Sequence, residues 1–455
     1  MVNIKTVSSI YADFITQTRY GGLPSKVVDQ AKQRILDLVG VSLAGYKLME
    51  FPQMVVNYMA SLGGLPEATI FQTKKKFPAI HAAFANGTCA HAIDMDDGHR
   101  FAASHPATVI VPAALAAAEM SEASTKELIT GVVIGYEIMI RIGNAINPSS
   151  LNRGFHTTGI TGTFGAAAAV ANIMKLDVEE VVGALGLAGL QSAGLLQVNH
   201  DMEGAKVKPI NPARAATSGL LSCILTKKGA RGPSNIFQGE DGFLKAFTDE
   251  VKEESLTRDL GETFEISKVY DKFYAACRHA HAAIDAALEV SRKGEIDVNQ
   301  IEAIAIETYP VAIRLAGITH PSTPSSARFS IPFSVALALI KKDVGADKYS
   351  EENIHDEKIQ KLAQRVVLSV GDQWEKTYPN KRGATVRILD RNKKEWSAEV
   401  ELAKGEPENP ASWGELYDKF FANATLLLSE KEAKKLGEVM IELEKQSIED
   451  LIQFI

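Results

Sequence analysis

Hydrophobic residues recur at helical spacing through roughly the first 260 residues of the chain. In residues 23–46 the apolar positions lie three or four apart on one face, and Pro24 suits the first turn of a helix. Alanine-rich runs at 112–118 and 166–171 are typical of helices that pack closely, because small side chains allow short distances between helix axes. The pattern predicts a dense helical region.

In the middle of the chain the pattern shifts toward a spacing of two. Residues 301–309 are rich in β-branched side chains and partly alternate, as expected of a strand. Residues 384–389 and 396–402 flank a polar turn and predict a hairpin with one buried face. Helical signals occur between these strands and before them, at 275–291 and 332–339. An α+β region is therefore expected here.

The chain ends in a second helical segment. Ser429 and Glu432 have capping-box spacing, and apolar residues then continue at helical intervals. Two helical segments that flank a mixed one suggest that the C-terminus returns to the first domain. We predict a mainly α fold, in which residues 1–264 and 403–455 form a large all-helical domain and residues 265–402 form an inserted α+β lid domain. A cleft between two domains is a favoured ligand site.

Composition narrows the partners of the protein. The net charge of −7 among 455 residues argues against binding to nucleic acid or to an anionic membrane. The three cysteines are far apart, so a thiolate zinc site is not expected and free thiols fit a reducing cytosol. The N-terminus lacks the apolar region of a signal peptide. Residues 181–199 are uncharged but rich in glycine, which favours a buried helical hairpin over a membrane span. We expect a cytoplasmic protein.

The candidate chemistry lies in residues 91–105, directly before an apolar run. Fifteen positions contain three carboxylates and three imidazoles, namely Asp94, Asp96, Asp97, His91, His99 and His105. Such groups are costly to bury unless they hydrogen-bond, bind a metal or take part in chemistry. For Asp96 and Asp97 a structural role is an alternative, in which they cap the following loop or pair with Arg100. The segment is the predicted active-site segment.

Five different short sequence blocks follow one another along nearly the whole chain. They are Asn86-Gly87 with residues 91–97 and His105-Pro106; residues 153–156 with Gly165; Lys208-Pro209 with Ala215-Ala216 and the loop 228–233; residues 272–277 with His281 and 284–286; and residues 329–333. In this order and spacing the blocks resemble the MmgE/PrpD family, which includes 2-methylcitrate dehydratases, cis-aconitate decarboxylases and iminodisuccinate epimerases. Residues 408–420 also look like the tail of that family.

The resemblance implies a homodimer, no metal or organic cofactor, and a small di- or tricarboxylate substrate. By resemblance, His105 is the main proton-transfer residue, Asp94 orients an imidazole or a substrate hydroxyl, and His156 is the second catalytic imidazole. Lys208 and Lys272 would hold substrate carboxylates from opposite sides of the cleft, and closure of the lid would assemble the site.

Further substrate contacts are expected at His99, Gly98 and His320. At Gly98 and around His320 the chain departs from the family pattern. Gly98 stands where the family commonly has threonine or serine, so one hydroxyl is lost. His320 lies in a segment where a tyrosine is often found, and Asn211 and Ala213 replace a frequent histidine and glycine. These departures weaken the transfer of any particular substrate.

The leading hypothesis is a cofactor-independent enzyme that transfers a proton next to a carboxylate. Dehydration of a 2-methylcitrate-like hydroxy acid is the first expectation; decarboxylation of cis-aconitate and epimerisation of an iminodisuccinate-like compound are alternatives, since all can use the same groups. A second class is a metal-dependent hydrolase that would use Asp96, Asp97, His99 and His105 as ligands. A third is a non-catalytic binding protein that keeps only the fold.

Overall fold

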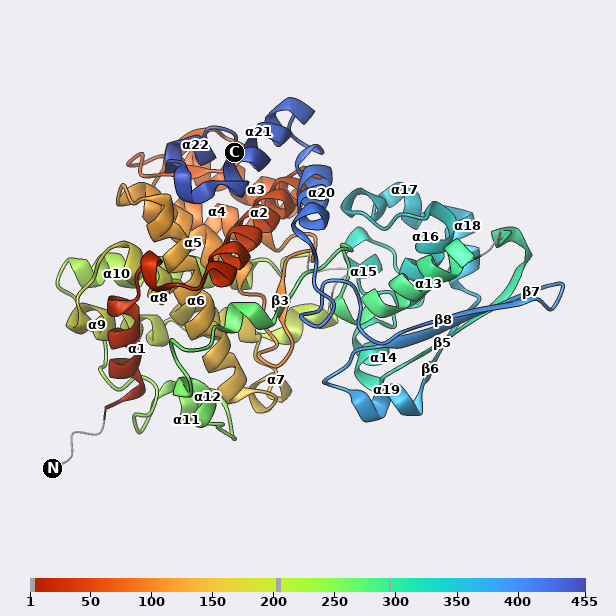
Figure 1. Cartoon of the computed structure of the whole chain (residues 1–455), viewed down its shortest axis with the longest axis horizontal. Coiled ribbons are helices and arrows are strands. Elements are labelled where there is room, and N and C mark those ends of the chain that lie inside the picture. The colour runs from red at the N-terminus through yellow and green to blue at the C-terminus, as the bar shows by residue number, and fades with distance from the viewer. Residues whose placement is uncertain (1–4, 202–205, 294–295) are drawn as a thin grey trace.

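The computed structural model describes residues 5–201, 206–293 and 296–455, and it confirms the mainly α fold. Helices make up 59% of the structure, and its described residues contain 22 α-helices with only small sheets. Figure 1 shows two parts, a larger one that holds both ends of the chain and a smaller one that holds the four-stranded sheet.

The larger part, here called the helical lobe, is built around one hydrophobic cluster of residues 7–269 and 420–455. Its N-terminal helices are α1 (Val7–Gln17), α2 (Ser25–Leu48), α3 (Glu50–Ser61), α4 (Ala79–Ala90), α5 (Ala107–Met120), α6 (Thr125–Ile146), α7 (Ser149–Asn152), α8 (Thr157–Ile173), α9 (Val178–Leu190), α10 (Ile210–Lys227), α11 (Phe243–Phe247) and α12 (Glu254–Thr257). Two short antiparallel pairs join β1 (Ala68–Ile70) to β2 (Lys75–Phe77) and β3 (Gly98–His99) to β4 (Val269–Tyr270).

The alanine-rich runs lie where the helices pack most closely. They fall in α5 and α8, which are buried along nearly their whole length. A Cβ added at Gly219 of α10 would lie only 2.5 Å from the Cβ of Ala166 in α8. Small side chains at such crossings let the helix backbones approach, as the sequence predicted.

The smaller part, here called the mixed lobe, has its own hydrophobic cluster, formed mainly by residues 275–403. Its sheet has the strand order β6-β5-β7-β8, with β5 parallel to β6 and antiparallel to β7. The strands are β5 (Ile301–Thr308), β6 (Val366–Val370), β7 (Ala384–Asp390) and β8 (Glu395–Val400). The helices are α13 (His281–Lys293), α14 (Pro310–Ala316), α15 (Pro324–Ala327), α16 (Ile331–Lys341), α17 (Glu351–Ile354), α18 (Glu357–Ala363) and α19 (Asp372–Thr377). The predicted hairpin is present as β7 and β8.

The C-terminal helices pack back onto the helical lobe (Figure 1). They are α20 (Trp413–Ala424), α21 (Glu430–Ile441) and α22 (Ile448–Ile452), and Ser429 and Glu432 form the predicted capping box at the start of α21. In α20, Lys419 pairs with Asp37 of α2 at 2.6 Å, and Phe420 packs against Gly40. The exact bounds of the predicted domains and the motion of a lid stay predictions.

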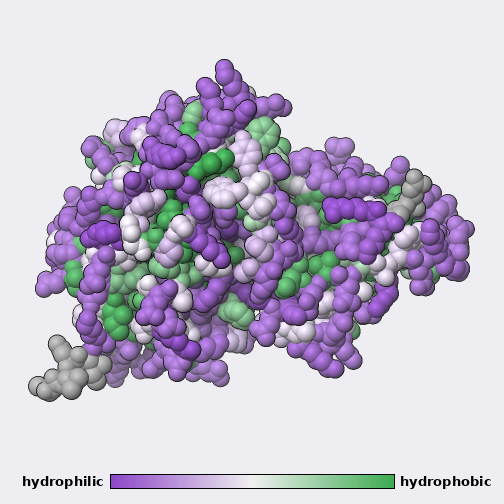
Figure 2. Space-filling model, viewed as in Figure 1, coloured by the Kyte–Doolittle hydropathy of each residue, from purple (hydrophilic) through white to green (hydrophobic). Residues whose placement is uncertain are grey.

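Two local expectations differ from the structure. Residues 181–199 do not form a helical hairpin: α9 ends at Leu190, and a turn leads into a short 3-10 helix at Leu196–His200. The helix expected at 275–291 begins only at His281. Within the described residues, α6 is the one helix long and apolar enough to cross a membrane, but 94% of its most apolar window is buried inside the protein. This burial makes α6 a core helix, and the face of the molecule drawn in Figure 2 is mostly hydrophilic.

Candidate active site

The segment 91–105 forms the buried connection between α4 and α5. His91 terminates α4, and Pro106 precedes the first turn of α5. Only the two residues of β3 are regular, and they pair with β4 beside Lys272. Asp94 has a positive φ of 54°, a conformation that non-glycine residues adopt only where the surroundings hold it. The loop thus places its polar side chains inside the protein.

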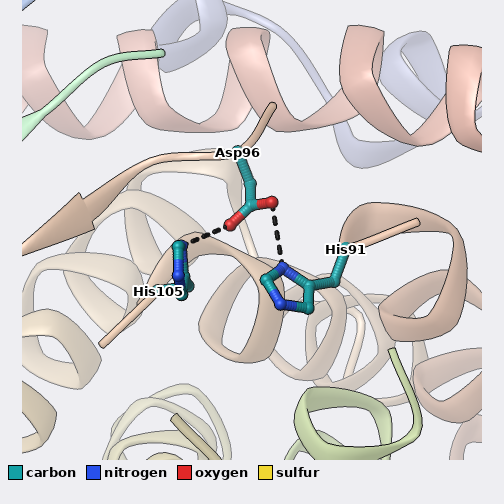
Figure 3. Close-up of side chains that lie close together, drawn as sticks. All are labelled: His91, Asp96 and His105. Carbon is teal, nitrogen blue, oxygen red and sulfur yellow. Dashed lines mark hydrogen bonds and ion pairs between the residues drawn. The ribbon is translucent and has the colours of Figure 1, made fainter. Parts of the chain in front are cut away.

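Asp96 lies between two imidazoles (Figure 3). One carboxylate oxygen is 2.9 Å from Nδ1 of His91 and the other is 2.9 Å from Nδ1 of His105. Burial opposes ionisation of Asp96, but His91 and His105 outweigh it and hold the pKa of this carboxyl well below its usual range. Asp96 is therefore an ionised carboxylate that orients both rings.

His105 presents its other ring nitrogen for chemistry. Its Nδ1 also lies 2.7 Å from the carbonyl oxygen of Asp97. Because both neighbours of Nδ1 are hydrogen-bond acceptors, Nδ1 carries the proton in the neutral ring and Nε2 is the basic atom. The backbone N–H of His105 donates to the Thr158 hydroxyl at 3.1 Å, which fixes the segment to α8. The side chain of His105 is 17% exposed, so its neighbours hold the ring while part of it stays accessible to solvent.

Asp97 has the structural role that the sequence left open. One carboxylate oxygen accepts from the N–H of Ala107 at 3.0 Å and so caps α5. The other accepts from the hydroxyl of Tyr136 at 2.7 Å. Burial raises the pKa of Asp97 to about 6. Arg100 pairs with Glu406 and Glu408, not with the aspartates.

Asp94 brings together two lysines from distant parts of the sequence. Lys208 lies 2.6 Å from one carboxylate oxygen, and Lys272 lies 3.0 Å from the other. Burial opposes the ionised form, but the two ammonium groups outweigh it and lower the pKa of Asp94 far below its usual range. The structure therefore assigns to Asp96 the orientation of the imidazoles predicted for Asp94, and places Asp94 between the lysines.

His156 completes the group at the start of α8. Its ring centroid lies 6.3 Å from that of His91, and burial together with the charge of Lys208 lowers its pKa well below the usual value. Nδ1 of His156 and Nε2 of His91 are buried without a hydrogen-bond partner among the described residues. Buried polar atoms rarely remain unpaired, so both nitrogens point to a bound ligand or solvent between them.

The remaining predicted contacts lie apart from this group. The Nδ1 of His99 accepts from the N–H of Ala102 at 3.0 Å, and its Nε2 faces Glu265 at 3.6 Å. Gly98 packs against Tyr270, and His320 is exposed between α14 and α15. Substrate contact by these three residues stays a prediction.

The four residues considered as metal ligands do not share one site, because Asp97 and His99 are engaged by the partners described above. In the part of the chain that the structure describes, the His/Cys/Asp/Glu group close enough to hold an ion is His91, Asp96 and His105. Its nitrogens and oxygens are 2.9 Å apart in each pair, which is the length of a direct hydrogen bond. The three side chains thus lie within direct contact of one another.

Comparison with known proteins decides the family. Residues 10–255 match the MmgE/PrpD N-terminal domain, and residues 274–445 match the MmgE/PrpD C-terminal domain. The chain belongs to the MmgE/PrpD family. This confirms the resemblance seen in the five sequence blocks.

Curated relatives of this family member align over most of its length at low identity. A cis-aconitate decarboxylase of Aspergillus terreus (strain NIH 2624 / FGSC A1156) is 24% identical over 93% of this chain and 90% of the relative. The cis-aconitate decarboxylase of Homo sapiens is 23% identical over 97% and 92%. A mitochondrial 2-methylcitrate dehydratase of Yarrowia lipolytica is 23% identical over 83% and 75%.

The sequence placed His91 and Asp96 in the predicted active-site segment but gave neither a role in catalysis, and for Asp96 it left a structural role open. The available signal was that His91, Asp96 and His105 all stand in one short loop before a helix, but sequence spacing in a loop does not show which acid faces which ring.

Buried neutral imidazoles predict that stability falls in acid. Burial lowers the pKa of five histidines, to about 4 for His91, to about 3 for His99, and well below the usual value for His156, His279 and His281. A histidine whose folded pKa is lowered contributes stability above about pH 6.5, and this is lost as the pH falls, because the unfolded chain binds more protons. Five buried carboxyls oppose the trend in part, because burial raises the pKa of Asp97 to about 6, that of Glu137 to about 7, and those of Asp37, Glu119 and Asp285.

We expect the free energy of unfolding to drop by about 2–4 kcal/mol per pH unit between pH 6.5 and pH 5. Urea unfolding at pH 7.5, 6 and 5 measures it. The exposed His355 provides a control, since His355→Gln leaves the profile unchanged. A free energy that stays constant over this range would contradict the prediction.

Proposed function

We propose that this protein is a cofactor-independent lyase that acts on a small di- or tricarboxylate by proton transfer next to a carboxylate. The observation that carries the proposal is the pairing of two buried carboxylates with opposite tasks: Asp96 orients two imidazoles, and Asp94 positions two lysines. Acid–base groups and cationic carboxylate grips are the two things that such a reaction needs.

The lysines can hold substrate without releasing Asp94. An ammonium group has three N–H donors; Lys208 uses one on Asp94, and Lys272 uses two, on the carboxylate and on the carbonyl oxygen of Asp94. Each lysine therefore keeps at least one donor for a substrate carboxylate. Charge-assisted bonds of this kind contribute about 1.5–3 kcal/mol each.

His105 is the proposed acid and base. Its Nε2 would take a proton from the carbon or oxygen next to a carboxylate, and the ionised Asp96 would stabilise the imidazolium that forms on the Nδ1 side. The unpartnered nitrogens of His91 and His156, whose ring centroids lie 6.3 Å apart, would bind substrate oxygens or pass the proton on. All these steps use groups of the chain alone.

The relatives guide the choice of reaction. The cis-aconitate decarboxylases align over more of the chain than the 2-methylcitrate dehydratase does, so decarboxylation is the first reaction to test. In that reaction the bond to a carboxylate carbon breaks, CO₂ leaves, and the electron pair left on carbon takes a proton from an acid such as the His105 imidazolium. Dehydration instead removes a proton and a hydroxyl from neighbouring carbons, and the same imidazole can serve both.

Proton NMR of metal-stripped enzyme in D₂O distinguishes these reactions. The substrates are cis-aconitate, 2-methylcitrate, citrate, tartrate and substituted succinates. Itaconate formed from cis-aconitate means decarboxylation, an alkene formed from a hydroxy acid means dehydration, and deuterium exchange alone means epimerase-type chemistry. Turnover that appears only after metal is added back would overturn the proposal in favour of a metal-dependent enzyme.

A further inference from the structure

Three arginines gather around Tyr270 where the two lobes meet. Arg278 and Arg382 lie over the Tyr270 ring, at 4.7 and 5.8 Å from its centroid. The third, Arg100, is joined to Arg382 through its backbone carbonyl. Guanidinium groups this close repel one another unless acids or ligands compensate them.

Two of the three arginines are compensated. Arg100 pairs with Glu406 and Glu408 at 2.7 Å each, and Arg278 pairs with Glu406 at 2.8 Å. Burial opposes ionisation of Glu406, but the surrounding guanidinium groups outweigh it and lower its pKa to about 2. The two glutamates make their ion pairs with Arg100 and Arg278, and Glu406 is close enough for the charge of Arg382 to lower its pKa as well.

Arg382 differs from its neighbours. It donates one hydrogen bond, from Nη2 to the carbonyl oxygen of Arg100 at 3.0 Å, and it has no ion pair with any carboxylate of the described residues. Its Nε is buried without a hydrogen-bond partner there, as are Nε of Arg100 and Nη2 of Arg278, so the missing ion pair is what sets Arg382 apart. A guanidinium has five N–H donors in a planar fork that fits a carboxylate, so this side chain is incompletely bound.

Arg382 is connected to the segment 91–105 through the Arg100 carbonyl and through Tyr270. The Asp97 carbonyl accepts from His105, and the next residue, Gly98, faces Tyr270 so closely that an added Cβ would lie 2.3 Å from the tyrosine Oη. Gly98 also pairs with Tyr270 in the β3–β4 ladder. Burial raises the pKa of Tyr270, while the positive charges of Arg382 and Lys272 oppose it, as expected if its hydroxyl lies near both.

We propose that Arg382 is a substrate-binding residue that holds a third carboxylate, apart from those held by Lys208 and Lys272. This inference rests on the proposed function. Tyr270, which takes the space of a side chain at position 98, supports the guanidinium with its ring. With Arg382 as a third cationic group, a tricarboxylate gains one charge-assisted pair that a dicarboxylate bound by the two lysines lacks, so the subsite would favour tricarboxylates.

Calorimetric titration with two non-reacting probes tests the subsite. The probes are propane-1,2,3-tricarboxylate and succinate, and the variants are Arg382→Gln, Arg382→Lys and the control Arg387→Gln. Arg387 is an exposed arginine of β7 that pairs with Glu307. Arg382→Gln is expected to weaken tricarboxylate binding about tenfold to a hundredfold and succinate binding less than about twofold. Arg382→Lys recovers part of the loss, and the control changes neither affinity.

A second variant tests the same subsite without removing a charge. Gly98→Ala must displace the Tyr270 ring, so it should reduce selectivity for the tricarboxylate in the same direction. Equal tricarboxylate affinity in wild type and Arg382→Gln would leave Arg382 only a structural partner of Tyr270 and would overturn the inference alone. Absence of polycarboxylate binding and turnover in the wild type would instead reject the proposed function, and this inference with it.

Discussion

Turnover by a His105→Ala variant falls about 10²–10⁴-fold below that of the wild type, while the fold is retained. The variant removes the imidazole whose Nδ1 is held 2.9 Å from Asp96 and 2.7 Å from the Asp97 carbonyl. Its loss removes one of the two imidazoles beside the buried Asp96 carboxylate and lowers stability, but His91 remains as the other partner. The NMR assay measures the rate, and circular dichroism with urea unfolding measures the fold.

His355→Ala is the matched control. His355 is exposed on the mixed lobe, so the variant enzyme should turn over substrate at the wild-type rate. Asp96→Asn tests the pairing of the Asp96 carboxylate with the His105 imidazole. It keeps the size of the side chain but removes the charge that stabilises the imidazolium, so its rate should lie between those of wild type and His105→Ala. Wild-type turnover by His105→Ala would remove this residue from the mechanism.

The second large effect is on stability. Asp94→Asn should lower the free energy of unfolding by about 3–5 kcal/mol, because breaking a buried ion pair leaves an uncompensated charge. That charge is Lys272, whose side chain is 1% exposed and which has Asp94 as its one ion-pair partner in the described part of the chain. Urea unfolding at pH 7.5 measures the change.

A double-mutant cycle separates lost charge balance from lost packing. Adding Lys272→Met to Asp94→Asn removes the unpaired ammonium group and should recover part of the stability. Asp241→Asn is the control, since that carboxylate is 97% exposed and its pair with Lys245 should contribute little. If Asp94→Asn unfolds at the same urea concentration as the wild type, the two lysines do not depend on Asp94.

Periodicity alone predicted most of the architecture. The helical face of residues 23–46 became α2, the alanine runs became α5 and α8, and the alternating residues 384–402 became the β7–β8 hairpin. These predictions succeed because burial on one face imposes a period of 3.6 or 2 on the sequence. The expected hairpin at 181–199 was wrong, since small residues suit a turn as well as a helix.

For the candidate site, the sequence by itself determined the segment 91–105 as the prediction and, through the family blocks, the two lysines that the structure brings beside it. Only the tertiary structure decided the partners. It placed Asp96 between His91 and His105, gave Asp94 to the lysines 208 and 272, and made Asp97 a cap of α5. Three acids within four loop positions have the same chemistry in the sequence, and no helix or strand period fixes where each points; contacts with α5, α8 and β4, far along the chain, make that choice.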